Sequence, residues 1–202
     1  MAIIAIFAIE NNFLCLKKIL LKVKNQLNNR LPLQCRTGHN RSFEIVKLNE
    51  LSGDHCAIYS IRFIGEDDSL FEQFLSEYYT TFRNEVLDIY TRLKAIGRCV
   101  GLREGFYKAN EGKPGDGVCA LYDKPDAHLR VYFIYYGTDL IVVGDGGEKP
   151  KNIRTWQEDP VLTDANLLMQ WVSEKISEAT ENKDIQITDK GFEGNLIIEV
   201  ED

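Results

Sequence analysis

The chain has 202 residues, a length that suits one well-packed domain better than two. With 44% apolar and 27% charged residues, its composition is that of an ordinary globular protein and does not predict disorder. The net charge of −7 argues against non-specific duplex binding through a large basic face, because counterion release needs many cationic contacts. A small phosphate site remains compatible with this charge.

The first 41 residues differ from the rest, because they hold seven Lys or Arg against one Glu. Their apolar opening run, residues 2–9, is far shorter than the about 20 residues of a membrane span, so we expect no membrane association. Residues 14–27 interleave lysines with Leu and Ile, a pattern that allows a basic amphipathic helix. This segment is either a surface helix, a loosely attached extension, or a helix that binds a membrane surface or a partner.

We therefore expect a basic extension at 1–41 and a single α+β domain at 42–202. The five cysteines are scattered and odd in number, which favours a reducing compartment and a cytoplasmic location. The three histidines lack the spacing of metal ligands, so we expect no metal.

The domain opens with a predicted hairpin, because residues 43–48 and 56–63 are β-rich and a Ser-Gly-Asp turn lies between them. A helix then begins at Ser69, since Ser69 and Glu72 have the spacing of a capping box. Apolar residues continue at helical spacing to Leu93. We expect one break near residues 79–81 and an end at Gly97.

The second half predicts three antiparallel strands at 118–122, 129–136 and 140–143. Gly137 and Thr138 fit a tight hairpin in which glycine supplies a positive φ. A second helix is expected from Thr163 or Asp164 to just before residue 182, followed by edge strands at 185–187 and 196–200. The elements together predict an α+β fold with a helical segment packed on an antiparallel sheet.

The strand at 129–136 carries the first candidate site residues. Alternation places Arg130, Tyr132 and Tyr136 on one side of it. We expect the other side to face the core and this side to present the cation and the phenols. An isolated arginine is also a common salt-bridge partner of a carboxylate, and that alternative stays open for Arg130.

A glycine-rich stretch at 144–151 contains Lys149 and Lys151 and is followed by Arg154. Glycine amides together with these cations could surround an anion at one end of the sheet. The stretch lacks the spacing of a P-loop or a dinucleotide fingerprint, and the alternative is a surface loop with solvated lysines. The turn-rich segment 105–117 allows Lys108 and Glu111 to flank the same site, or it is a long surface connection.

The order of these elements, with LRVYF at 129–133, IVVG at 141–144 and GEKPK at 147–151, resembles the RelE/HigB-like toxin superfamily of bacterial type II toxin–antitoxin systems. The resemblance covers residues 66–180. It implies a RelE-like fold, here with an extra N-terminal hairpin and a C-terminal helix.

The resemblance also implies a metal-independent endoribonuclease that cleaves messenger RNA, often on the ribosome, and that needs no cofactor. Arg130 would stabilise the phosphate, and Lys149 or Lys151 would act as a second cation or a base. Tyr132 would help orient the scissile group, and the further RNA contacts would come from Tyr136, Arg154 and Lys108.

The partner implied by the resemblance is a cognate antitoxin, commonly a small helix-turn-helix protein. A second function is compatible with the same residues: a non-catalytic protein-binding module, or an inactive relative of the same fold. Activity that depends on the basic segment at a membrane surface is a third and less favoured alternative.

Overall fold

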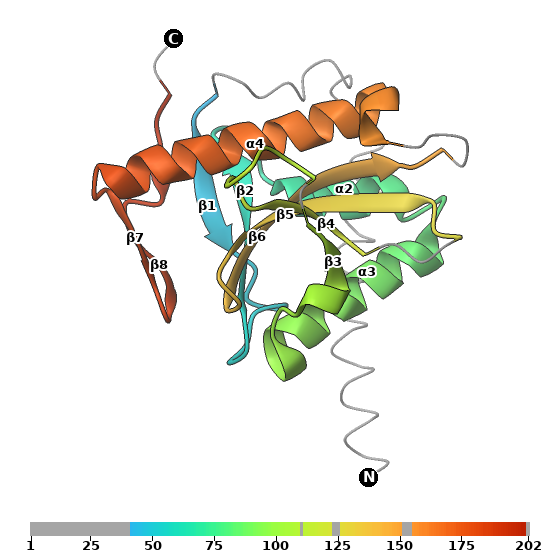
Figure 1. Ribbon diagram of the computed structural model, residues 1–202, viewed down its shortest axis with the longest axis horizontal. Helices are drawn as coiled ribbons and strands as arrows, with labels where there is room; N and C mark the ends of the chain where they lie inside the picture. Colours follow the sequence, from blue (N-terminus) through green and yellow to red (C-terminus); the bar gives the residue numbers. More distant parts are fainter. Residues whose placement is uncertain (1–40, 110, 123–125, 151–154, 201–202) are drawn as a thin grey trace.

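The computed structural model describes residues 41–109, 111–122, 126–150 and 155–200 (Figure 1). These residues form an α+β fold around a seven-stranded sheet with the strand order β3-β4-β5-β6-β2-β1-β9. Neighbouring strands are antiparallel except β2 and β6, which run parallel. The expected α+β fold with a mostly antiparallel sheet is therefore confirmed.

The predicted N-terminal hairpin is confirmed as β1 (Phe43–Lys47) and β2 (Ala57–Phe63), which pair in antiparallel register. Sequence periodicity could not show how this hairpin joins the rest of the sheet. It does so through the parallel pairing of β2 with β6 (Leu140–Glu148), which brings residue 57 beside residue 140.

The helix predicted from Ser69 is confirmed as α2 (Leu70–Tyr78). The Ser69 hydroxyl accepts a hydrogen bond from the amide of Glu72, and the Glu72 carboxylate accepts one from the amide of Ser69. The predicted break is also present, because α3 (Arg83–Ala95) starts after a short turn.

The predicted helix end at Gly97 is wrong. The helical run continues through a π-helical turn, Ile96–Val100, and stops at Gly101, whose φ is 69°. Gly97 lies inside this turn, where its carbonyl accepts hydrogen bonds from the amides of residues 55 and 56. A Cβ at Gly97 would lie 2.0 Å from the carbonyl oxygen of Leu51, so close backbone approach rather than helix termination requires this glycine.

The second half of the sheet contains the short β3 (Tyr107–Lys108), β4 (Val118–Leu121) and β5 (Leu129–Tyr136). The β5–β6 hairpin turns at Gly137, whose φ of 68° confirms the predicted positive φ. Its loop is one residue longer than the predicted two, because Tyr136 pairs with Leu140. The prediction that the glycine-rich stretch after residue 143 leaves the sheet is also wrong, because the glycines at 144–147 belong to β6.

The C-terminal helix α4 (Pro160–Glu181) starts earlier than predicted, with Asp159 as N-cap and Pro160 in its first turn. It runs across the strands on one face of the sheet (Figure 1). The other face is covered by α2 and α3. The sheet is thus the middle of three layers, and the expectation that one face of β5 stays open is wrong.

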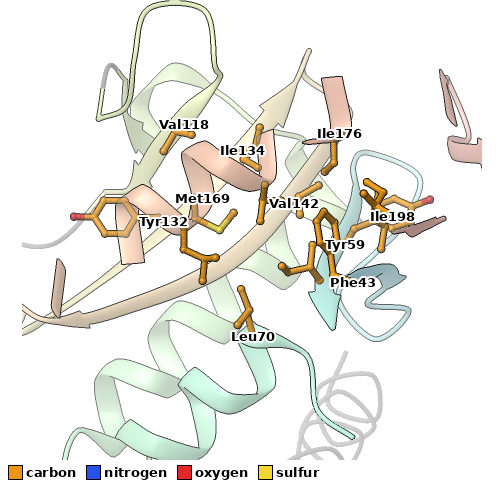
Figure 2. Packing of buried hydrophobic residues seen from close by; sticks show 14 of the residues in the cluster. Phe43, Tyr59, Leu70, Val118, Tyr132, Ile134, Val142, Met169, Ile176 and Ile198 are labelled. Atoms are coloured by element: carbon orange, nitrogen blue, oxygen red, sulfur yellow. The ribbon is translucent and has the colours of Figure 1, made fainter. Parts of the chain in front are cut away.

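Each face of the sheet has its own apolar core. Under α4, Met169 and Ile176 pack with Tyr132, Ile134 and Val142 (Figure 2). On the other face, residues of α2 and α3 pack against strand residues of the opposite alternation; the principal members are Phe71, Phe74, Val86, Leu93, Ile58, Phe133 and Ile141.

The C-terminal tail contributes only in part to the sheet edge. β7 (Ile185–Thr188) and β8 (Gly191–Gly194) form a separate two-stranded hairpin at the end of α4, as Figure 1 shows. β9 (Ile197–Ile198) joins the main sheet beside β1, as predicted for an edge strand. No helix in the described part of the chain is both long enough and apolar enough to cross a membrane.

Candidate functional site

The proposed site residue Arg130 lies beneath α4, where it is 7% exposed. Its guanidinium is 3.5 Å from the carboxylate of Glu111, and the two side chains are 8% and 14% exposed. The neighbouring carboxylate offsets part of the cost of desolvating this buried cation. Of the two interpretations that the sequence left open for Arg130, the structure supports the one in which it is the salt-bridge partner of a carboxylate.

The Arg130–Glu111 pair belongs to a polar network between the sheet and α4. The Asn166 side chain donates to the carbonyl of Glu111 at 2.9 Å, and Gln170 donates to Asn166 at 2.6 Å. One turn further on, the Ser173 hydroxyl donates to the carbonyl of Asp116 at 2.6 Å. These contacts attach residues 111–116 to α4.

Sequence reasoning missed the α4 members of this network. Asn166, Gln170 and Ser173 recur at intervals of four and three residues, so they share one side of the helix. All three are buried between the apolar positions of α4. Polar residues at this spacing within an apolar helix face could have predicted a buried polar network, because buried polar groups need hydrogen-bond partners.

The two phenols assigned to the site are buried to different degrees, because Tyr136 is only partly buried. Tyr132 is 0% exposed and belongs to the core under α4, as Figure 2 shows. Burial raises the pKa of Tyr136 above its ordinary value, and its ring meets that of Phe192 edge-on at 5.5 Å between centroids. Tyr132 is not placed to stack on an RNA base in this conformation, because α4 covers the face that was expected to be open. The ring of the partly buried Tyr136 packs against Phe192 of β8.

The lysines lie at the same end of the sheet as Arg130. Lys108 in β3 pairs with Ala120, which pairs in turn with Tyr132, so these three share the α4 side of the sheet. The Lys108 ammonium lies 5.5 Å from the centre of the exposed Tyr122 ring. Lys149 follows β6 and donates its backbone amide to the carbonyl of His128.

The site is therefore assembled only in part. The sheet register brings Lys108, Arg130 and Lys149 to one end of neighbouring strands, and Glu111 joins them as foreseen for a residue flanking the site. Arg130 is buried, whereas Lys108 and Lys149 are half-buried. Lys151 and Arg154 lie outside the described residues.

The glycines of β6 explain why α4 packs so closely over this end. A Cβ at Gly144 would lie 1.9 Å from the sulfur of Met169, and one at Gly147 would lie 2.9 Å from the side chain of Val161. The absence of side chains at these two positions lets α4 approach the sheet. The glycine-rich stretch therefore serves helix–sheet packing here and does not form an anion-binding loop over these residues.

His128, the residue before β5, pairs with the start of α3. Its Nδ1 is 2.7 Å from the carboxylate of Glu85, which also accepts the backbone amides of His128 and Leu129. Burial by itself would raise the pKa of Glu85, but the hydrogen bonds from His128 and Leu129 outweigh it and hold the pKa below its ordinary value.

A predominantly acidic region lies elsewhere in the described structure, on α4 and the β7–β8 hairpin. Within residues 155–200, three lysines stand against ten Asp or Glu. We call the exposed carboxylates of this region the acidic surface; they are Asp164, Glu174, Glu178, Glu181, Asp184, Asp189 and Glu193. One of them, Glu178, forms an ion pair with Lys175. This surface attracts cations and repels phosphate.

Among the described residues, no group of three His, Cys, Asp or Glu side chains is arranged to hold a metal ion. Comparison of the chain with known protein families, with curated proteins and with solved structures finds no match.

Proposed function

We propose that this chain is a non-catalytic protein-binding module and that its acidic surface recognises a cationic protein partner. The observation that carries the proposal is the one-sided charge of α4 and the β7–β8 hairpin, in which exposed carboxylates outnumber cations. A surface of one sign steers oppositely charged partners and discriminates against partners of like charge. It therefore favours a basic protein over a nucleic acid.

The burial of two of the expected catalytic residues, Arg130 and Tyr132, supports the same choice. Stabilising a phosphate in the transition state requires preorganised donors aimed at the reacting group. The guanidinium of Arg130 is directed to Glu111, and Tyr132 is covered by α4. A nuclease built on these groups would need α4 to move away from the sheet and expose the apolar residues beneath it.

The alternative, a toxin-type messenger ribonuclease with an antitoxin partner, stays a prediction. Lys149 is half-buried, whereas Arg130 and Tyr132 are buried, so Lys149→Ala tests this alternative at the less buried position. Under the binding-module proposal, purified wild-type chain and Lys149→Ala leave messenger RNA intact, both with and without ribosomes. Cleavage by the wild-type chain that is lost in Lys149→Ala would overturn the proposal.

The acidic surface is tested by charge reversal. The triple variant Glu174→Lys, Glu178→Lys and Glu181→Lys removes three of its carboxylates, all exposed on α4. The control reverses the same number of exposed charges outside the acidic surface, at Asp54, Glu104 and Asp126. Proteins captured by each tagged chain from the producing cells are identified by mass spectrometry at low and high salt.

We expect the wild-type chain and the control variant to capture a basic protein at low salt. The α4 triple variant should not capture this protein. Because exposed charges are screened within about 8 Å at 0.15 M ionic strength, higher salt should also reduce its capture. Identical captured sets for the two charge-reversed variants would show that the acidic surface does not select the partner.

A further inference from the structure

One end of the sheet lacks its third layer. α2 packs against β6 and β2, but the strands β1 and β9 beyond them have no helix over the same face among the described residues. The side chains that point to this side stay accessible: Ile197 is 45% exposed and Ile64 is 53% exposed. On the opposite face of the same strands, Phe43 and Ile198 are buried beneath α4.

The pairing register shows which residues share the uncovered face. Ile197 pairs with Glu44, and Glu44 pairs with Arg62, so their side chains point to one side. Ser60, two residues before Arg62 on the same strand, contacts the first turn of α2, which identifies this side as the α2 face. Ile64 follows the end of β2 and Glu199 follows the end of β9, and both are exposed. Together with Ile197, Glu44 and Arg62 they are called here the uncovered face.

The chain enters the fold beside this face. Arg41, the first described residue, is held by an ion pair with Glu66 at 2.7 Å and by the ring of Phe63, 4.3 Å from its guanidinium. The amide of Ile64 donates to the carbonyl of Ser42. Forty residues of chain therefore end within a few positions of the two exposed isoleucines.

The sequence of those forty residues matches the uncovered face in polarity and in charge. Apolar residues recur every three or four positions, the spacing of one side of a helix: Phe13, Leu16, Leu20, Val23 and Leu27. Four lysines lie at 17, 18, 22 and 24. The uncovered face and its border carry three carboxylates: Glu44, which is paired with Arg62 at 2.5 Å, Glu66, which is paired with Arg41, and the exposed Glu199. These three carboxylates exceed the two arginines by one, so the net charge of the face and its border is opposite in sign to that of the lysines.

We propose that residues 13–27 dock as an amphipathic helix on the uncovered face and complete the third layer of the fold beside α2. The 13 residues from 28 to 40 span up to about 40 Å when extended, which is enough to return a helix of about 20 Å to the face. Tethering makes this contact intramolecular and raises its effective concentration. The inference does not depend on the proposed function, because the acidic surface lies on α4 and the β7–β8 hairpin.

Photo-crosslinking of the full-length chain tests this docking. The photo-reactive amino acid p-benzoylphenylalanine replaces Ile197 in one variant and the exposed Leu167 of α4 in a matched control. Peptide mapping then identifies the cross-linked segment, and the mass of the product separates links within one chain from links between two. We expect position 197 to cross-link to residues 13–27 within one chain, and position 167 not to do so.

Two substitutions in the segment sharpen the test. Leu20→Asp lies on the apolar stripe, whereas Leu21→Asp makes the same chemical change off the stripe. We expect Leu20→Asp to reduce the yield of the cross-link from position 197 about tenfold, because a leucine of the proposed contact is lost. Leu21→Asp should leave that yield unchanged. A cross-link between two chains, a link to residues 13–27 from position 167 instead, or no link from position 197 would each overturn the docking.

Discussion

The side chain of Arg130 shows how context decides the role of a single residue. In the sequence it stands between aliphatic neighbours on a strand, a setting compatible with phosphate binding. In the structure its guanidinium is paired with Glu111 under α4. A buried charge needs a fixed partner, and the removal of one partner leaves the other desolvated and uncompensated.

Arg130→Met should therefore lower the free energy of unfolding by about 3 kcal/mol or more, because it leaves the Glu111 carboxylate without this partner in a largely buried position. The exposed Lys190 provides a control with the same change in net charge. Lys190→Met should change the free energy of unfolding by less than about 0.5 kcal/mol. Urea unfolding at pH 7 measures both, and equal midpoints would contradict the structural role of Arg130.

Glu85 predicts a pH dependence. Its pKa is lower in the folded chain than in the unfolded chain, so its contribution to stability is complete above its unfolded pKa and is lost as the pH falls through its folded pKa. Glu85→Gln should destabilise the protein by about 1–3 kcal/mol at pH 7, since three hydrogen bonds to a carboxylate are weakened.

The cost of Glu85→Gln should shrink as the pH falls below about 4.3, the ordinary pKa of an unfolded glutamate, and on through the lower folded pKa of Glu85. Thermal unfolding of the two proteins between pH 3 and pH 7 checks this. Glu174→Gln, at an exposed position on α4, should follow the wild-type curve at each pH. A constant difference between Glu85→Gln and wild type over the whole range would be inconsistent with the hydrogen-bonded carboxylate.

At the scale of elements, β6 is the strand whose composition is most easily misread. Its sequence, LIVVGDGGE, changes from an apolar run to glycines, and such a change is typical of a loop. The chain nevertheless remains extended, because residues 146–148 pair with residues 129–131 of β5. The pairing shifts between Val131 and Phe133, where Gly144 and Asp145 have no paired residue on β5.

Gly146 is the glycine of β6 at which an added side chain would clash with backbone atoms. A Cβ there would lie 1.9 Å from the carbonyl oxygen of Arg130, and backbone atoms cannot rotate away as a flexible side chain can. Gly146→Ala should therefore lower the free energy of unfolding by at least about 2 kcal/mol. Gly105→Ala is the control, because an added Cβ there meets nothing within 4 Å.

Chemical unfolding of the two glycine variants measures the difference. Gly105→Ala should stay within about 0.5 kcal/mol of wild type. Wild-type stability in both variants would show that β6 does not hold residue 146 against β5.

At the scale of the whole molecule, one sheet separates two apolar cores. Both tryptophans, Trp156 and Trp171, pack against the core under α4. Leu93 lies in the other core and is 1% exposed. The strands between the two cores alternate their side chains, so loss of packing on one face removes support from residues on the other.

Leu93→Ala should consequently lower the urea midpoint of tryptophan fluorescence, even though no tryptophan shares its core. A buried Leu→Ala change costs about 2–5 kcal/mol. Far-UV circular dichroism should report the same midpoint, because a single domain of this size is expected to unfold cooperatively. A fluorescence transition that stays at the wild-type midpoint while the dichroism shifts would indicate that the two faces unfold separately.

The sequence by itself determined the local elements. The capping box at Ser69, the alternation along 129–136 and the positive φ at Gly137 depend on interactions within a few residues, and the structure matches them. The helix end at Gly97 and the loop at 144–147 were misread for the opposite reason. These glycines are required by close contacts with residues distant in the sequence. Gly97 lies against Leu51, Gly144 against Met169 and Gly147 against Val161.

Only the tertiary structure decided which face of the sheet is covered and what the site residues can reach. The parallel pairing of β2 with β6 and the placement of α4 over β5 join segments far apart in the chain, and no local pattern encodes such pairings. Arg130 and Tyr132 therefore have the residue types of a phosphate site but lie in a closed interior. The free energy gained by burying the apolar side of α4 outweighs the cost of desolvating the cation and the phenol on the strand beneath it.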